Sequence, residues 1–121
     1  MTIIIKGVFP GLNEFIDANR RKNGRWYAGN SMKQRDQNII AWQLPGFHTK
    51  KPIILRYRFY CPNRKKDKDN ISGYFHKVFQ DALVQMHCIP DDGWNNIDGF
   101  SDEFFIDSVN PRVEVDIWEV K

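Results

Sequence analysis

Aspartates gather in two short stretches of this sequence. Asp67 and Asp69 stand in "NRKKDKDN", directly after a run of basic residues, and Asp91 and Asp92 stand in "IPDDGW". Hard cations such as Mg²⁺ bind a few carboxylates together with water and substrate phosphate oxygens. A bound ion of this kind polarises a phosphate and can supply or orient an attacking hydroxide. The residue types therefore point to metal-assisted chemistry on a phosphate.

The same aspartates have an alternative interpretation as turn and cap residues, because their side chains bond readily to nearby backbone amides. A calcium EF-hand loop starting at Asp67 is excluded, since Ser72 would replace its glycine and Val78 its glutamate. The histidines and cysteines lack the spacing of zinc ligands. No phosphate loop, dinucleotide fingerprint or hydrolase nucleophile motif occurs, so no nucleotide cofactor is expected.

Charge is distributed unevenly along the chain. Residues 1–66 hold 14 Lys and Arg against 3 Asp and Glu, whereas residues 67–121 hold 4 against 12. This asymmetry indicates a polyanion-binding part beside an acidic part, and two solvated faces of opposite sign are the alternative. Cations attract phosphates whatever the sequence, and aromatics such as Trp26 and Tyr27 can stack on unpaired bases. The candidate DNA-binding residues are Arg20, Arg21, Lys22, Arg25, Lys33, Arg35, Arg64, Lys65 and Lys66.

Length and composition limit the class of protein. A chain of 121 residues that is 41% hydrophobic and 27% charged suits one globular domain. No apolar run approaches the roughly 20 residues of a membrane span, and the opening residues lack the features of a signal peptide. Cys61 and Cys88 do not make a disulfide framework, so a reducing cytoplasm is expected.

The elements that must position the aspartates follow from hydrophobic periodicity. The clearest helix has one apolar stripe from Ile71 to Met86, between the two aspartate pairs. The other predicted elements are strands at 2–9 and 52–60, helices near 12–21 and 31–43, a loop at 89–99, and a closing pair of strands at 100–107 and 112–120. The order β-α-β-α-β-β predicts an α/β (α+β) fold, with helices packed on one mixed sheet in a single domain over residues 1–121.

The motifs, taken in order, resemble the RusA family of Holliday junction resolvases. A D-x-D-N sequence precedes the helix, Lys77 and "DAL" lie within it, and the "DD" pair follows it. "FPGLNEF", with Asn13, is similar to the proline-then-asparagine signature of the family after its first strand. The closing sequence from Asp91 onward looks like the bacteriophage and prophage branch, so the resemblance runs nearly end to end.

The resemblance implies a homodimeric endonuclease that uses Mg²⁺, with Mn²⁺ as an alternative, and nicks four-way DNA junctions symmetrically. The resemblance also implies a role in recombination, repair or phage DNA processing, in the cytoplasm of a bacterial or phage-infected cell. The essential acids would be Asp67, Asp69 and Asp92, with Asp91 as a further metal ligand and Lys77 as the catalytic lysine. Two other functions stay open: a branched-DNA-binding module without catalysis, and a less specific flap or branch nuclease.

Lys77 departs from the usual pattern of the family. It stands four residues late, and Gly73 occupies the usual lysine position. Four residues are about one helical turn, so the lysine stays on nearly the same side of the helix but moves roughly 6 Å along its axis. A bulge around Ser72 and Gly73 would restore the usual place, but the apolar phase favours an early helix start. The alternative for Lys77 is a solvated lysine that pairs with Asp81 at i+4.

Overall fold

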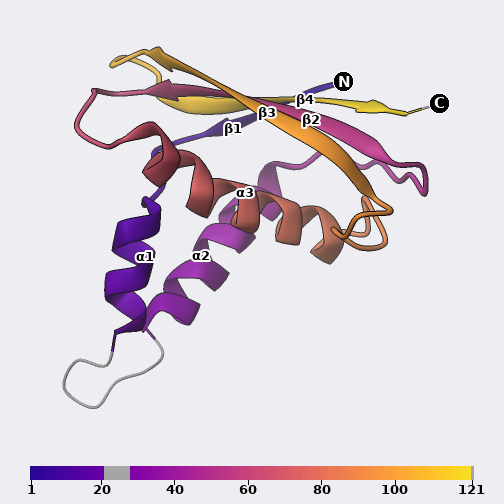
Figure 1. Ribbon diagram of the computed structural model, residues 1–121, viewed down its shortest axis with the longest axis horizontal. Helices are drawn as coiled ribbons and strands as arrows, with labels where there is room; N and C mark the ends of the chain where they lie inside the picture. Colours follow the sequence, from indigo (N-terminus) through magenta and orange to yellow (C-terminus); the bar gives the residue numbers. More distant parts are fainter. Residues whose placement is uncertain (21–27, 121) are drawn as a thin grey trace.

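The computed structural model describes residues 1–20 and 28–120, which form a mixed sheet covered by helices (Figure 1). The two helical segments predicted between the first strands are confirmed, and the second begins earlier than expected. The third strand begins inside the segment predicted as a loop. The elements in chain order are β1 (Thr2–Lys6), α1 (Leu12–Asn19), α2 (Ala28–Gln43), β2 (Ile53–Cys61), α3 (Lys68–Gln85), β3 (Ile97–Ile106) and β4 (Arg112–Glu119).

The four described strands pair in the order β1-β4-β2-β3. β2 and β3 are parallel, whereas β4 is antiparallel to both of its neighbours, β1 and β2. The closing strands β3 and β4 are therefore consecutive in the chain but separated in the sheet by β2. A parallel pair needs a long crossover connection, and α3 supplies it. The predicted mixed sheet with packed helices, in one small α+β domain, is confirmed.

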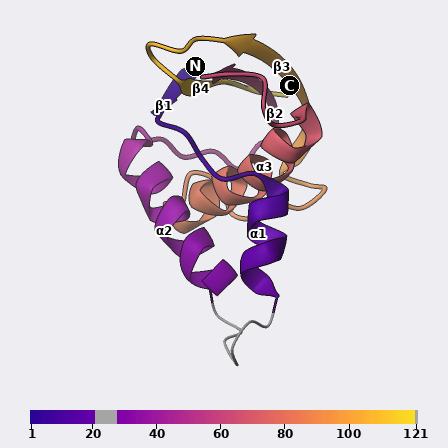
Figure 2. The same cartoon turned by 90° about the vertical axis from the view of Figure 1, so that its left-hand side faces the viewer.

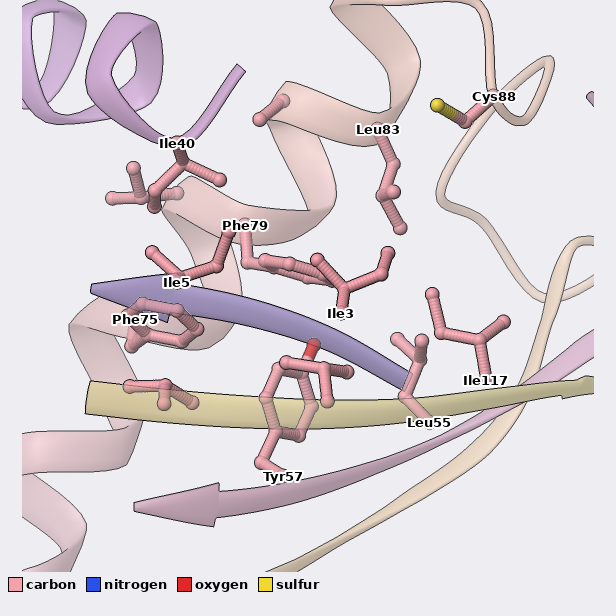
Figure 3. Packing of buried hydrophobic residues seen from close by; sticks show 14 of the residues in the cluster. Ile3, Ile5, Ile40, Leu55, Tyr57, Phe75, Phe79, Leu83, Cys88 and Ile117 are labelled. Carbon is pink, nitrogen blue, oxygen red and sulfur yellow. The ribbon is translucent and has the colours of Figure 1, made fainter. Parts of the chain in front are cut away.

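The described helices α1, α2 and α3 lie on one side of the sheet (Figure 2). Strand residues alternate between this covered face and the opposite face, so β2 buries Leu55, Tyr57 and Phe59. The Tyr57 ring packs against Phe75 and Phe79 in the apolar stripe of α3 (Figure 3). Phe59 also packs against Phe75. Burying each large apolar side chain stabilises the fold by roughly 1.5–3 kcal/mol. This contact fixes α3 against the middle of the sheet.

A buried hydrogen bond joins α2 to α3. The Tyr74 hydroxyl donates to Asp36 Oδ2 across 2.6 Å, and Asp36 is only 3% exposed. Burial, together with the Asp36 carboxylate, raises the pKa of the Tyr74 phenol. The pairing satisfies a carboxylate that would otherwise be costly to bury.

The uncovered face of the sheet carries a ladder of ion pairs. Asp116 on β4 accepts from Arg56 at 2.7 Å and from Arg58 at 2.8 Å, and Glu114 lies 3.4 Å from Arg58. Because β4 lies beside β2, acids from the second half of the sequence neutralise cations from the first half. The predicted division into a polyanion-binding part and an acidic part is therefore not present on this face.

The described helices include none that is both long and apolar enough to cross a bilayer.

Candidate functional site

Asp67 and Asp69 lie at the N-terminus of α3. Asp67 is the residue before the helix, without a side-chain capping bond, and Asp69 stands in the first turn. Both side chains are exposed, and Asp69 Oδ1 accepts the backbone N–H of Asn70 at 2.9 Å. The helix starts at Lys68 and runs without a break, as the apolar phase predicted. The alternative of a bulge near Ser72 and Gly73 is therefore excluded.

An open cavity of about 610 Å³, here called the Asp67 cavity, lies beside this helix end. Its walls combine cations, aromatic rings and one carboxylate, and Lys68 Nζ stands 5.6 Å from the centre of the Phe104 ring. A helix N-terminus also favours anions, because its first backbone N–H groups lack partners within the helix. The lining residues are Cys61, Asn63, Arg64, Lys66, Asp67, Lys68, Ile71, Phe104, Phe105 and Ile106.

Asp91 and Asp92 lie beyond the opposite end of α3. This helix has 18 residues and is therefore about 27 Å long. It leads from the end of β2 back to the start of the parallel strand β3, so the segments before and after it lie at opposite ends of the sheet. The crossover that builds the sheet thus separates the two aspartate pairs.

The Asp92 carboxyl lies near that of Asp81, which is about three turns along α3 from Asp69. Asp69 and Asp81 are twelve residues apart in one helix, which corresponds to about 18 Å. Among residues 1–20 and 28–120, no three His, Cys, Asp or Glu side chains are grouped closely enough to hold a metal ion. Within one chain, the structure does not bring Asp92 to Asp67 and Asp69.

Two cations flank the Asp81–Asp92 pair. Lys33 Nζ is 2.6 Å from Asp81 Oδ2, and Lys77 Nζ is 3.3 Å from Asp81 Oδ1. Burial and the neighbouring Asp81 carboxyl raise the pKa of Asp92, and Lys77 partly offsets this rise. Burial also raises the pKa of Asp81, but Lys33 and Lys77 outweigh it and leave this pKa low. The i+4 pair of Lys77 with Asp81 that the sequence predicted is present.

The predicted DNA-binding residues fall into three groups. Several are engaged with acids: Arg20 with Asp17 at 3.4 Å, Arg35 with Asp36 at 3.5 Å, Lys33 with Asp81, and Lys66 with Glu14 at 2.5 Å. Arg64 and Lys65 are exposed, and Arg64 lines the Asp67 cavity. Arg21, Lys22 and Arg25, together with Trp26 and Tyr27, lie outside the described residues.

A polar connection that the sequence interpretation missed holds the loop after β1 against the start of α3. Asn70 Oδ1 accepts the backbone N–H of Asn13 at 2.7 Å. Gly11 packs so closely on Asn70 that a Cβ there would lie 2.5 Å from its Nδ2. Lys66 Nζ donates to the Phe9 carbonyl at 3.4 Å. The available signal was the asparagine after D-x-D, together with the glycine that follows a proline after the first strand.

Replacing Asn70 with alanine is expected to lower the free energy of unfolding by about 1 kcal/mol, because the Asn13 amide loses its acceptor. Urea denaturation would measure the change. Asn95→Ala is the matched control, since Asn95 is exposed in the loop before β3. Equal effects of the two substitutions would show that the Asn70 hydrogen bond does not stabilise the fold.

The sequence matches no protein-family model, and it has no significant match among curated proteins. The resemblance to the RusA family therefore depends on the ordered motifs alone. What the structure adds is their placement: the D-x-D-N segment opens α3 beside a basic cavity, and the "DD" pair lies at the far end of the same helix.

Proposed function

We propose that the chain is a Mg²⁺-dependent endonuclease of the RusA type that resolves four-way DNA junctions by paired nicks. One observation carries the proposal. Two exposed carboxylates, Asp67 and Asp69, stand at a helix N-terminus, where Asp67 lines a cavity together with Arg64 and Lys68. Carboxylates that can hold an ion, next to groups that attract phosphate, suit hydrolysis of a phosphodiester.

The donor set fits Mg²⁺ without a third acid. Mg²⁺ usually keeps several waters and is bound by one or two carboxylates plus substrate phosphates. Asp67 and Asp69 supply two carboxylates that are open to solvent, and Mn²⁺ accepts the same oxygen ligands. The bound ion would polarise the scissile phosphate and lower the pKa of an attacking water.

The residues near the start of α3 have separate roles in this proposal. Asp67 and Asp69 hold the ion, while Arg64 and Lys68 contact the phosphates of the same strand. Lys77 lies eight residues beyond Asp69, about 12 Å along the helix axis. It is 64% exposed, so we assign it to a phosphate further along the strand rather than to the scissile one.

We further propose that the chain acts as a homodimer, as its resemblance to the RusA family implies. A two-fold symmetric dimer presents two identical sites, which suits paired nicks at symmetric positions in a junction.

The proposal is tested by incubating the purified chain and Mg²⁺ with a synthetic four-way junction, a flap and a linear duplex of matched sequence. Selective, symmetric nicking of the junction supports it. Equal cutting of the flap or duplex would indicate a less specific nuclease. Junction binding without cutting would indicate a binding module and would contradict the proposed activity.

Replacing Arg64 and Lys65 with glutamine is expected to weaken junction binding and to reduce its salt dependence. The slope of log affinity against log salt concentration should fall by about 1 for each phosphate that the protein no longer neutralises. Fluorescence anisotropy at several salt concentrations would measure it. Lys50→Gln is the control, because this exposed lysine precedes β2 at the opposite end of the sheet. An unchanged slope in the double variant would remove Arg64 and Lys65 from the interface.

A further inference from the structure

A second cavity lies on the other side of the segment that leads from β2 to α3. This cavity, here called the Phe9 pocket, has a volume of about 220 Å³. It opens among the loop after β1, the end of β2 and the start of β4. Its apolar walls include Phe9, Pro10, Phe59, Pro62, Ile71 and Phe75. The Phe9 and Phe75 rings meet edge to face, with centroids 5.4 Å apart.

The Phe9 pocket adjoins the Asp67 cavity. Both are lined by Cys61, Asn63, Lys66 and Ile71, so these residues separate two spaces with different chemistry. The Asp67 cavity is lined by a carboxylate and cations, whereas apolar side chains predominate in the Phe9 pocket. A ligand with a charged backbone and a flat ring system could fill both at once.

The charge at the Phe9 pocket favours such a ligand. The described residues that line it include three cations and no acid. Lys66 is already paired with Glu14, and Arg112 with Glu114 at 2.6 Å. Lys65 is exposed and supplies the cation that is open to a phosphate at the mouth.

We propose that the Phe9 pocket receives one unpaired nucleobase of a DNA strand whose phosphates lie in the Asp67 cavity. This inference rests on the proposed function. The volume lies below the roughly 300–1,000 Å³ of sites for drug-sized ligands, which suits a single ring system. Aromatic walls bind base faces without regard to sequence. The exposed Asn63 side chain, whose Oδ1 accepts the Lys65 backbone N–H, keeps its amide N–H groups for a polar base edge.

The pocket gives the chain a way to prefer branched DNA over linear duplex. Taking a base out of a paired stack costs a few kcal/mol, and least where the base is already unpaired. A strand at a branch point can supply such a base at low cost, whereas a linear duplex must be opened first. Selectivity would then arise from the state of the base rather than from its identity.

Cys61 offers a direct probe of the pocket. It is half-buried and lines both cavities, whereas Cys88 is only 1% exposed. Burial raises the pKa of the Cys61 thiol, so alkylation by a maleimide is best followed under mildly alkaline conditions. Mass spectrometry of the digested chain would give the rate at Cys61 separately from that at Cys88.

The experiment compares two four-way junctions without added metal. One carries an unpaired adenine at the branch point, and the other carries an abasic residue in its place. At about ten times the dissociation constant, the adenine junction is expected to slow alkylation of Cys61 about tenfold, and the abasic junction clearly less. Phe9→Ala is expected to weaken binding of the adenine junction about tenfold and to leave the abasic junction nearly unaffected.

Two results would overturn the inference. Equal protection of Cys61 by both bound junctions would show that the pocket holds no base, while the proposed nuclease function could still stand. Failure of both junctions to bind would remove the inference and the proposed function together. The alkylation test uses the wild-type chain, so it does not depend on the folding of Phe9→Ala.

Discussion

Replacing Asp67 with asparagine is expected to lower Mg²⁺-dependent nicking of a four-way junction on the order of a hundredfold, the scale of losing one charge-stabilising group. Asparagine keeps the shape of the side chain but is a poor ligand for a hard cation. It is also as good a residue as aspartate at the position before a helix, so the stability of α3 should hardly change. If Asp67→Asn folds normally but no longer nicks the junction, the loss would therefore show that Asp67 is needed to hold the ion.

Asp98→Asn is the matched control, because Asp98 is exposed near the start of β3, at the end of the sheet away from Asp67. Asp69→Asn should behave like Asp67→Asn. Asp92→Asn should cost less, because Asp92 lies beside Asp81, which is about 18 Å from Asp69 along α3. Full activity in Asp67→Asn would contradict the proposed site, and equal losses in all three variants would require Asp92 to reach the same ion.

Replacing Asp116 with asparagine is expected to destabilise the chain by about 2 kcal/mol at neutral pH. Partial burial by itself raises the pKa of Asp116, but hydrogen bonds from Thr2, Arg56 and Arg58 outweigh it and lower the pKa to about 2. The substitution also removes a negative charge that pairs with the Arg58 guanidinium. The Nε of Arg58 is already buried without a partner among the described residues.

The pH dependence of stability follows from the same pKa. Because the folded pKa of Asp116 lies below its ordinary value of 3.8, the ionised form stabilises the fold above about pH 5. This contribution is lost as the pH falls from about 4 through 2. Urea denaturation of the wild type should therefore show a loss in this range that is smaller in Asp116→Asn.

Glu119→Gln is the control for this prediction. Its pair with Lys51 is long, at 3.8 Å, and both side chains are at least half exposed, so it should contribute little. Equal stability of Asp116→Asn and Glu119→Gln would show that the ladder on the uncovered face is not a source of stability.

The local elements could be read from the sequence because periodicity reports burial. The stripe from Ile71 to Met86 predicted α3 and its early start, since residues that pack on a sheet recur at helical spacing. Alternation in 52–60 predicted β2 for the corresponding reason. The pairing of Lys77 with Asp81 was also available, because i and i+4 are neighbours on a helix.

The long-range arrangement could not be read in this way. Aspartates on either side of a helix looked able to converge, but the direction of β3 decides whether they do. Because β3 runs parallel to β2, the Asp67 and Asp92 segments lie at opposite ends of the sheet. The uneven charge along the sequence does not separate in space on the uncovered face, since pairing of β4 with β2 brings Asp116 onto Arg56 and Arg58.

Anomalous scattering from Mn²⁺ in crystals of the chain with a four-way junction tests the central proposal most directly. A peak beside Asp67 and Asp69, next to a phosphate of the bound strand, is the predicted result. Asp67→Asn crystals, grown in the same way, should lose that peak. An ion found instead beside Asp81 and Asp92, or a bound junction with no ion at the start of α3, would contradict the proposed site.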